Sequence, residues 1–123
     1  MRAVSVGAVG RAAKLAAMLD GFAESPSRVA VVHSSRGFVT HTGTFGGVPV
    51  SIIATGMGLA MADFVARELR ACVDATAADP VLLVRLGTCG SMAPNVPVGM
   101  LHDANGMSQA LLYIYSHTVY VYF

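Results

Sequence analysis

Charged side chains are scarce in this sequence. Aspartate, glutamate, lysine and arginine make up 12% of the 123 residues, against roughly 25% in an average soluble domain. The net charge is +1, so the chain lacks the basic surface field that attracts nucleic acid. Hydrophobic residues make up 54%, which excludes a disordered segment. We therefore expect a compact domain and no nucleic-acid partner.

Paired cysteines, clustered histidines and long apolar runs are also missing. The only two cysteines, Cys72 and Cys89, form no CxxC motif, and the four histidines lie far apart. We therefore expect neither a disulfide framework nor a metal site. No stretch reaches the roughly 18 apolar residues that a membrane helix needs, and polar and basic residues interrupt the start, unlike a secretory signal. A reduced, cytoplasmic protein without a membrane partner is the expectation.

The order of apolar runs and glycine turns predicts an α/β fold, a central mixed β-sheet flanked by helices. The expected strands are 3–6, 29–33, 38–45, 48–54 and 81–84, and the expected helices are 11–20 and 60–73. Gly21 should cap the first helix at its C-terminus, and Gly46-Gly47 should form a hairpin turn. The continuous apolar run 81–84 indicates a strand buried on both faces, which leads Arg85 into the following turn.

The last part of the chain differs in composition from the rest. No charged residue follows Asp103, and all four tyrosines lie between Tyr113 and Tyr122. Residues 111–123 are β-prone and uncharged, so they would promote aggregation if they were left uncovered. They are interpreted either as a C-terminal strand or as the result of a change in reading frame or splice form near residue 100.

Three glycine turns place backbone N–H groups beside polar or cationic side chains. The turns at 7–11 and 55–58 each lead into a helix N-terminus, which favours an anion. Arg85, with Thr88 close by, follows a buried strand, and ligands of open α/β sheets collect at the carboxyl ends of strands. An arginine there is costly unless it is paired. It could bind a buried carboxylate, or phosphate oxygens that match its fork; composition leaves both open.

Four sequence blocks stand out, namely 6–11 (VGAVGR), 35–38 (SRGF) with 42–45 (TGTF), 54–58 (ATGMG) and 84–91 (VRLGTCGS). These blocks resemble the nucleoside phosphorylase family, most closely its uridine phosphorylases, and they occur in the family's order. The family's hexameric purine nucleoside phosphorylases share the Thr-Gly-Thr and Gly-Met-Gly character. The resemblance therefore leaves a purine nucleoside as the alternative to uridine.

The resemblance implies a role for each matching residue. The implied phosphate-binding residues are Gly7, Arg11, Arg36, Arg85 and Thr88, and Arg85 and Thr88 are also the implied catalytic residues. Arg36 matches an arginine that reaches into a neighbouring subunit, which implies a homo-oligomer, either a dimer or a trimer of dimers. The implied substrate-binding residues are Met57, Gly58, Cys89 and Gly90.

The implied reaction is phosphorolysis, in which an oxygen of inorganic phosphate attacks the anomeric carbon of a nucleoside as the base departs. The products are the free base and ribose 1-phosphate, as in nucleoside salvage. Phosphate is the co-substrate, and no other cofactor is implied. Because such a transition state has oxocarbenium character, arginines that fix the phosphate also place negative charge against the forming cation.

The sequence departs from the family in its first loop, after Arg36 and in its length. Ala8 and Val9 replace an Asp-Pro pair, so the loop lacks a carboxylate, and Gly37 replaces a glutamate that helps some members bind a monovalent cation. We expect no such ion.

The family fold continues for roughly as many residues again. Residues 1–100 are therefore expected to be the N-terminal half of a truncated phosphorylase domain, and 101–123 a divergent, uncharged C-terminal tail. Two alternatives to an active phosphorylase follow. One is a non-catalytic family member or interaction subunit, and the other, less favoured, is a hydrolytic nucleosidase, which does not need three phosphate-facing arginines.

Overall fold

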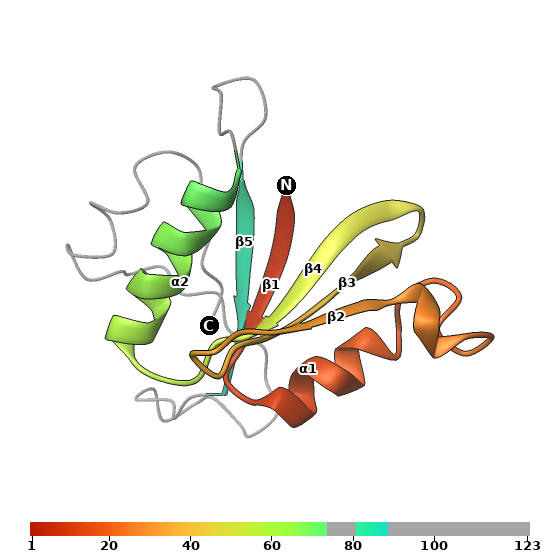
Figure 1. Ribbon diagram of the computed structural model, residues 1–123, viewed down its shortest axis with the longest axis horizontal. Coiled ribbons are helices and arrows are strands. Elements are labelled where there is room, and N and C mark those ends of the chain that lie inside the picture. Colours follow the sequence, from red (N-terminus) through yellow and green to blue (C-terminus); the bar gives the residue numbers. More distant parts are fainter. Residues whose placement is uncertain (74–80, 89–123) are drawn as a thin grey trace, which may run out of the picture.

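The computed structural model describes residues 1–73 and 81–88. In chain order the elements are β1 (Arg2–Val6), α1 (Val9–Ala16), the 3-10 helix η1 (Pro26–Arg28), β2 (Ala30–His33), β3 (Val39–Phe45), β4 (Val48–Ala54), α2 (Leu59–Cys72) and β5 (Leu82–Leu86). The strands form one sheet in the order β2-β3-β4-β1-β5 (Figure 1). β1 runs parallel to β4 and β5, whereas β3 runs antiparallel to β2 and β4. The predicted mixed sheet with flanking helices is confirmed.

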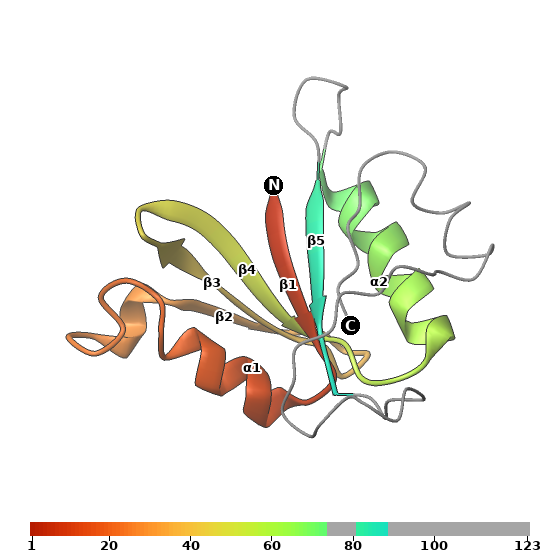
Figure 2. The same cartoon turned by 180° about the vertical axis from the view of Figure 1, so that it is seen from behind.

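The two α-helices pack on opposite faces of the sheet (Figures 1 and 2). On one face, Ile52 of β4 belongs to a buried cluster that includes Ala12 and Ala16 of α1. On the other face, Ile53 belongs to a second cluster, and Leu69 of α2 packs against it. Because consecutive strand residues point to opposite faces, neighbouring residues of a central strand pack into different core clusters. None of the described helices is long and apolar enough to cross a bilayer.

The β3–β4 hairpin turns at Gly46-Gly47, as predicted, and Asp20 holds this turn. Gly46 and Gly47 have φ angles of 58° and 76°, the left-handed values that a tight hairpin turn requires at both central residues. Their N–H groups donate to the Asp20 carboxylate over 3.0 and 2.8 Å. The Asp20 N–H in turn donates to the carbonyl of Thr44 over 2.8 Å. Asp20 therefore ties the end of the α1 segment to the hairpin.

The prediction that the first helix extends to Asp20 with Gly21 as its cap is wrong. The helix ends at Ala16, and the N–H groups of Met18 and Leu19 bond to carbonyls three residues earlier. Such bonds tighten the chain into turns. Asp20 then bonds to the hairpin, so its backbone is no longer available to continue the helix.

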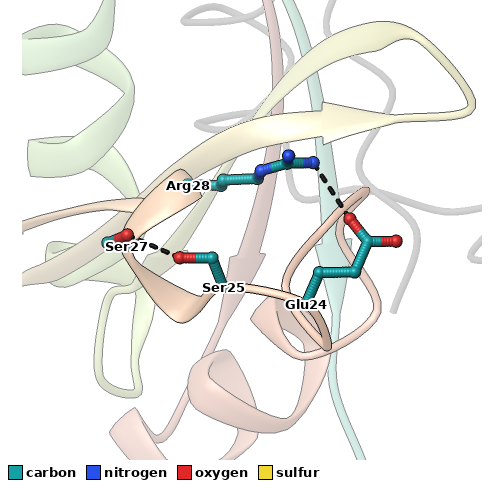
Figure 3. Close-up of polar contacts among 4 residues, drawn as sticks. All are labelled: Glu24, Ser25, Ser27 and Arg28. Carbon is teal, nitrogen blue, oxygen red and sulfur yellow. Dashed lines mark hydrogen bonds and ion pairs between the residues drawn. The ribbon is translucent and has the colours of Figure 1, made fainter.

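Gly21 lies in the loop that carries the chain from α1 to the edge strand β2. Its φ angle is 73°, and a Cβ placed on it would lie 2.7 Å from Arg28 Cδ, so this turn favours glycine. Figure 3 shows two polar contacts of the loop, Arg28 with Glu24 at 3.0 Å and Ser25 with Ser27 at 2.7 Å. Because these side chains are exposed, the ion pair adds little to stability.

The last described strand differs from its prediction. β5 continues through Leu86, so Arg85 lies within the strand and not in the turn after it. The prediction of burial on both faces is also wrong for the described residues, because Leu83 is buried while Leu82 and Val84 are only half-buried. The described core beneath α1 contains no residue of β5. Within residues 1–73 and 81–88, the face of β5 that carries Val84 is therefore less covered than the corresponding face of β4.

The Asp20 carboxylate should make the stability of the fold depend on pH. Its hydrogen bonds from Gly47 and then from Gly46 lower its pKa in the folded protein. A lowered folded-state pKa gives stabilisation that is present above the unfolded-state pKa of about 3.9 and is lost as the pH falls through the folded-state value. We expect Asp20→Asn to lower the urea midpoint at pH 7 and to reduce its fall between pH 5 and 2.

Asp63→Asn is the control for this experiment, because the Asp63 carboxylate contacts the Arg67 side chain and not the hairpin. Equal acid slopes for the wild-type protein and Asp20→Asn would contradict the role of the hairpin bonds.

Candidate functional site

Three strands end side by side at one edge of the sheet. β1 runs parallel to both of its neighbours, β4 and β5. The carboxyl ends of the three strands, followed by Gly7, the Thr55-Gly56 turn and Gly87, therefore lie at the same edge (Figure 1). Ligands of open α/β sheets bind at this edge. The polar residues that the sequence places at these three strand ends therefore meet in one region.

Neutral oxygens from β1 and from the turn after β4 hold the Arg85 guanidinium. Its Nη1 donates to Ser5 Oγ over 2.9 Å and also to Thr55 Oγ1. Its Nη2 donates to the carbonyl oxygen of Gly56 over 2.9 Å. Ser5 is the direct partner of Arg85 in the register between β1 and β5. The strand pairing therefore places acceptor and donor beside each other.

The two hydroxyl groups beneath Arg85 form a network that can be fully satisfied. Ser5 and Thr55 are both buried, and their hydroxyl oxygens lie 2.9 Å apart. Thr55 Oγ1 donates to the carbonyl of Val6 over 3.3 Å. If the Ser5 hydroxyl donates to Thr55, both oxygens keep lone pairs for the guanidinium. Each buried hydroxyl then has a partner for its proton.

The guanidinium groups of Arg11 and Arg85 both lie close to Gly7. A Cβ placed on Gly7 would lie 3.1 Å from Arg11 Nη2, 3.4 Å from Arg85 Nη2 and 3.4 Å from the Gly56 carbonyl oxygen. The two guanidinium groups thus border the space that a side chain at residue 7 would occupy. Glycine at this position leaves that space open.

The site gathers positive charge without a carboxylate among residues 1–73 and 81–88. The side-chain ion pairs recorded there join Glu24, Asp63 and Glu68 to arginines other than Arg11 and Arg85. Burial lowers the pKa of Arg85, and the charge of Arg11 lowers it further, but an arginine remains protonated in proteins. Two cations without a counter-ion attract an anion.

The N-terminus of α1 adds to this field. The helix begins at Val9, its first turn contains no acidic residue, and no side chain caps it. Its first N–H groups and the positive end of its dipole therefore remain available to an anion. In the described part of the chain, no carboxylate pairs with Arg85, so the ion pair that the sequence left open as an alternative to phosphate binding is not found there.

Arg36 lies at the same edge of the sheet but is not brought to the two arginines. The turn that carries it precedes β3, whose first residue pairs with the last residue of β4. The Arg36 guanidinium lies 3.4 Å from the Glu68 carboxylate and 4.8 Å from the centre of the Phe64 ring, both on α2. Its side chain is 63% exposed. The structure thus presents Arg36 at the protein surface.

Three other implied site residues that the structure describes, Thr88, Met57 and Gly58, follow the ends of β5 and β4. Thr88 is exposed just beyond β5. Met57 and Gly58 follow Gly56, and Met57 is 80% exposed. The φ angle is 73° at Gly56 and 93° at Gly58. Cys89 and Gly90 lie outside the described residues. The roles assigned to these five positions stay predictions.

The sequence analysis did not identify Ser5 as a site residue, and it placed Thr55 in a turn without predicting that its hydroxyl contacts Arg85. Ser5 interrupts an otherwise apolar strand, where a hydroxyl needs a partner. That interruption is the signal that could have identified it. Its partner is 80 residues away in the chain, so only the strand register reveals it.

Comparison with known proteins identifies the family of the chain. The sequence model of the phosphorylase superfamily matches residues 2–109. The chain belongs to that superfamily. The match runs past residue 100, where the sequence predicts that the resemblance ends, and the division into 1–100 and 101–123 stays a prediction.

Relatives from this superfamily differ in their substrates. Over 63 residues the chain is 44% identical to a purine nucleoside phosphorylase of DeoD type from Streptococcus uberis, a match that covers 51% of this chain and 24% of the relative. A uridine phosphorylase structure from the oomycete Phytophthora capsici is 47% identical, with a TM-score of 0.67, and the match covers 78% of this chain and 30% of that one. A Trypanosoma brucei nucleoside phosphorylase with uridine phosphorylase activity is 30% identical, with a TM-score of 0.62, over 78% and 35% of the two chains. The chain thus spans only a minor part of the length of each relative.

The paired arginines predict that inorganic phosphate stabilises the folded protein. Binding to the folded state raises the free energy of unfolding by about 2.7 kcal/mol when the ligand is at 100 times its Kd. We expect Arg85→Ala to abolish the phosphate-induced rise in Tm because it removes half of the charge. Gly7→Ala should reduce that rise because its Cβ enters the space between the guanidinium groups.

Arg67→Ala serves as the control, since it removes an exposed arginine that pairs with Asp63 on α2. It should leave the phosphate-induced shift unchanged. The assignment fails if Arg85→Ala and Arg67→Ala show the same shift as the wild-type protein.

Proposed function

We propose that this chain carries the phosphate-binding part of a nucleoside phosphorylase. The observation that supports this most is the meeting of the Arg11 and Arg85 guanidinium groups above Gly7, with no carboxylate among the described residues to neutralise them. A phosphate dianion supplies two negative charges and oxygens that match the guanidinium fork. Membership of the phosphorylase superfamily supports the same ligand.

The proposed reaction needs the protein to position phosphate and to stabilise charge. One phosphate oxygen forms a bond to the anomeric carbon of the nucleoside as the bond to the base breaks and the base leaves with its electron pair. The arginines hold the phosphate in line, and the bound dianion stabilises the oxocarbenium character of the sugar. Thr88 is proposed to add a hydroxyl contact to the phosphate. Inorganic phosphate is the co-substrate, and no further cofactor takes part.

Uridine is the proposed substrate, and a purine nucleoside is the second candidate. The uridine phosphorylase of Phytophthora capsici, 47% identical over most of this chain, supports a pyrimidine nucleoside. The DeoD-type enzyme of Streptococcus uberis, 44% identical over 63 residues, supports a purine nucleoside. In either case, Met57 and Gly58 are proposed to line the ribose side, with Cys89 and Gly90 between the phosphate and the nucleoside.

A non-catalytic role is the principal alternative. The matches cover only 24% to 35% of the three relatives, so an activity that belongs to a whole relative does not pass to this chain by similarity alone. A chain with a phosphate site and without turnover would act as an interaction subunit or a remnant of a phosphorylase.

A turnover assay separates these functions. The purified 123-residue chain is incubated with uridine or inosine, with and without inorganic phosphate, and release of the free base is measured. We expect phosphate-dependent release of uracil that Arg85→Ala abolishes. Phosphate-independent release would indicate a nucleosidase, and phosphate binding without release of either base would indicate the non-catalytic alternative.

Arg36 is proposed to complete the phosphate site of a second copy of the chain, because its guanidinium lies exposed at the protein surface and away from Arg11 and Arg85. Arg36→Ala and Arg85→Ala should each be inactive alone. In a symmetric dimer each interface contact occurs twice, so random mixing of the two variants should restore about a quarter of the sites. Their mixture should therefore recover about that share of the wild-type activity. A mixture as inactive as its components would show that Arg36 does not act in a second copy.

A further inference from the structure

Ser5 is the buried hydroxyl on which the orientation of Arg85 depends. It lies on β1, between its register partners Ile53 of β4 and Arg85 of β5, and its Oγ accepts a hydrogen bond from Arg85 Nη1 over 2.9 Å. We propose that Ser5 is a positioning residue, which orients the Arg85 guanidinium so that its free donors face the anion above Gly7. This proposal rests on the proposed function, because it takes that anion to be phosphate.

A count of donors shows what this anchoring leaves free. A guanidinium carries five N–H groups. The two on Nη1 go to Ser5 and Thr55, and one on Nη2 goes to the Gly56 carbonyl. The Nε–H and the second Nη2–H then have no acceptor among the described residues. Two free N–H groups of one guanidinium are what a bidentate bond to phosphate oxygens requires.

A hydroxyl suits this position better than a carboxylate or an apolar side chain. A carboxylate at residue 5 would neutralise Arg85 and compete with the incoming anion. An apolar side chain would leave an Nη1–H without its acceptor and would free the guanidinium to rotate. Ser5 accepts the hydrogen bond and adds no charge, so Arg85 keeps its positive charge for the ligand.

The position of Ser5 also makes it a rigid anchor. It belongs to a strand that is hydrogen-bonded on both sides, and its hydroxyl lies 2.9 Å from that of Thr55. Groups held on strands keep their geometry better than groups held on loops. The guanidinium is thus fixed from inside the sheet, and its Nη2 borders the open space at Gly7.

The test measures the Kd for inorganic phosphate by calorimetric titration of the 123-residue chain. Ser5→Ala should weaken binding about tenfold, since a hydrogen bond to a charged group orients the donor that binds phosphate. Ser5→Thr keeps the hydroxyl and should bind within about threefold of the wild-type protein. Ser51→Ala is the matched control. Ser51 is also a buried serine on the same face of the sheet, but its hydroxyl pairs with Thr42 at 3.0 Å and not with Arg85.

A double-substitution cycle separates positioning from a general loss of structure. Arg85→Lys keeps a positive charge but lacks the planar fork. If Ser5 acts through that fork, Ser5→Ala should have less than a threefold effect on the Kd in the Arg85→Lys background. The same tenfold effect in both backgrounds, or equal effects of Ser5→Ala and Ser51→Ala, would overturn the proposal. Thr55→Val against Thr55→Ser repeats the comparison at the second hydroxyl if Ser5→Ala does not fold, with weaker binding expected for valine only.

The outcomes also distinguish this proposal from the proposed function. If the wild-type chain does not bind phosphate, both fail. If phosphate binds and Arg85→Ala abolishes binding while Ser5→Ala leaves the Kd unchanged, the phosphate site stands and the positioning role of Ser5 is wrong.

Discussion

A half-buried guanidinium on a β-strand imposes the main constraint on this structure. Arg85 needs hydrogen-bond acceptors because an unsatisfied charge inside a protein is costly. The acceptors that surround it are two hydroxyl groups and one carbonyl oxygen, all neutral. These acceptors satisfy the hydrogen bonds of the guanidinium but do not neutralise its charge. Among the described residues the site therefore remains electropositive, and Arg11 increases this potential.

That arrangement depends on the order of the strands. The acceptors come from β1 and from the turn after β4, and β1 lies between β4 and β5. The parallel register places Ser5 directly beside Arg85. Gly56 follows β4 with a φ angle of 73°, a conformation that glycine adopts readily and in which its carbonyl accepts from Arg85. A different strand order would leave Arg85 without two of its three acceptor residues.

Most strands, and the hairpin turn, were predictable from the sequence because they depend on local patterns. The apolar run of β4 and the Gly46-Gly47 turn were predicted with the bounds that the structure has. A shared site for Arg11 and Arg85 was implied by the resemblance to the phosphorylase family, and the parallel pairing of β1 and β5 explains why the two residues lie close together. The early end of α1 could not be predicted, since it reflects the bonds of Asp20 to a hairpin more than twenty residues away.

The contacts within the site were predictable only in part, for the same reason. The position of Arg36 beside Phe64 and Glu68 requires knowledge of where α2 packs. The bond from Arg85 to Ser5 requires the strand register. Sequence motifs indicated which residues have the chemistry to bind an anion, but not which neutral groups hold them. The roles of Thr88, Met57 and Gly58 stay predictions.

The two faces of the sheet divide stability and function between them. The face beneath α1 packs apolar residues such as Val6 and Ile52 into the larger core. Among the described residues, the core cluster on the opposite face has three buried members, and this face also carries the buried hydroxyls of Ser5 and Ser51. An apolar residue in place of Ser5 would bury more apolar surface and so favour folding, but it would deprive Arg85 of an acceptor. The buried serine is therefore best explained by the Arg85 guanidinium that it holds. A position inside the sheet is thus set by the needs of the site and not by packing alone.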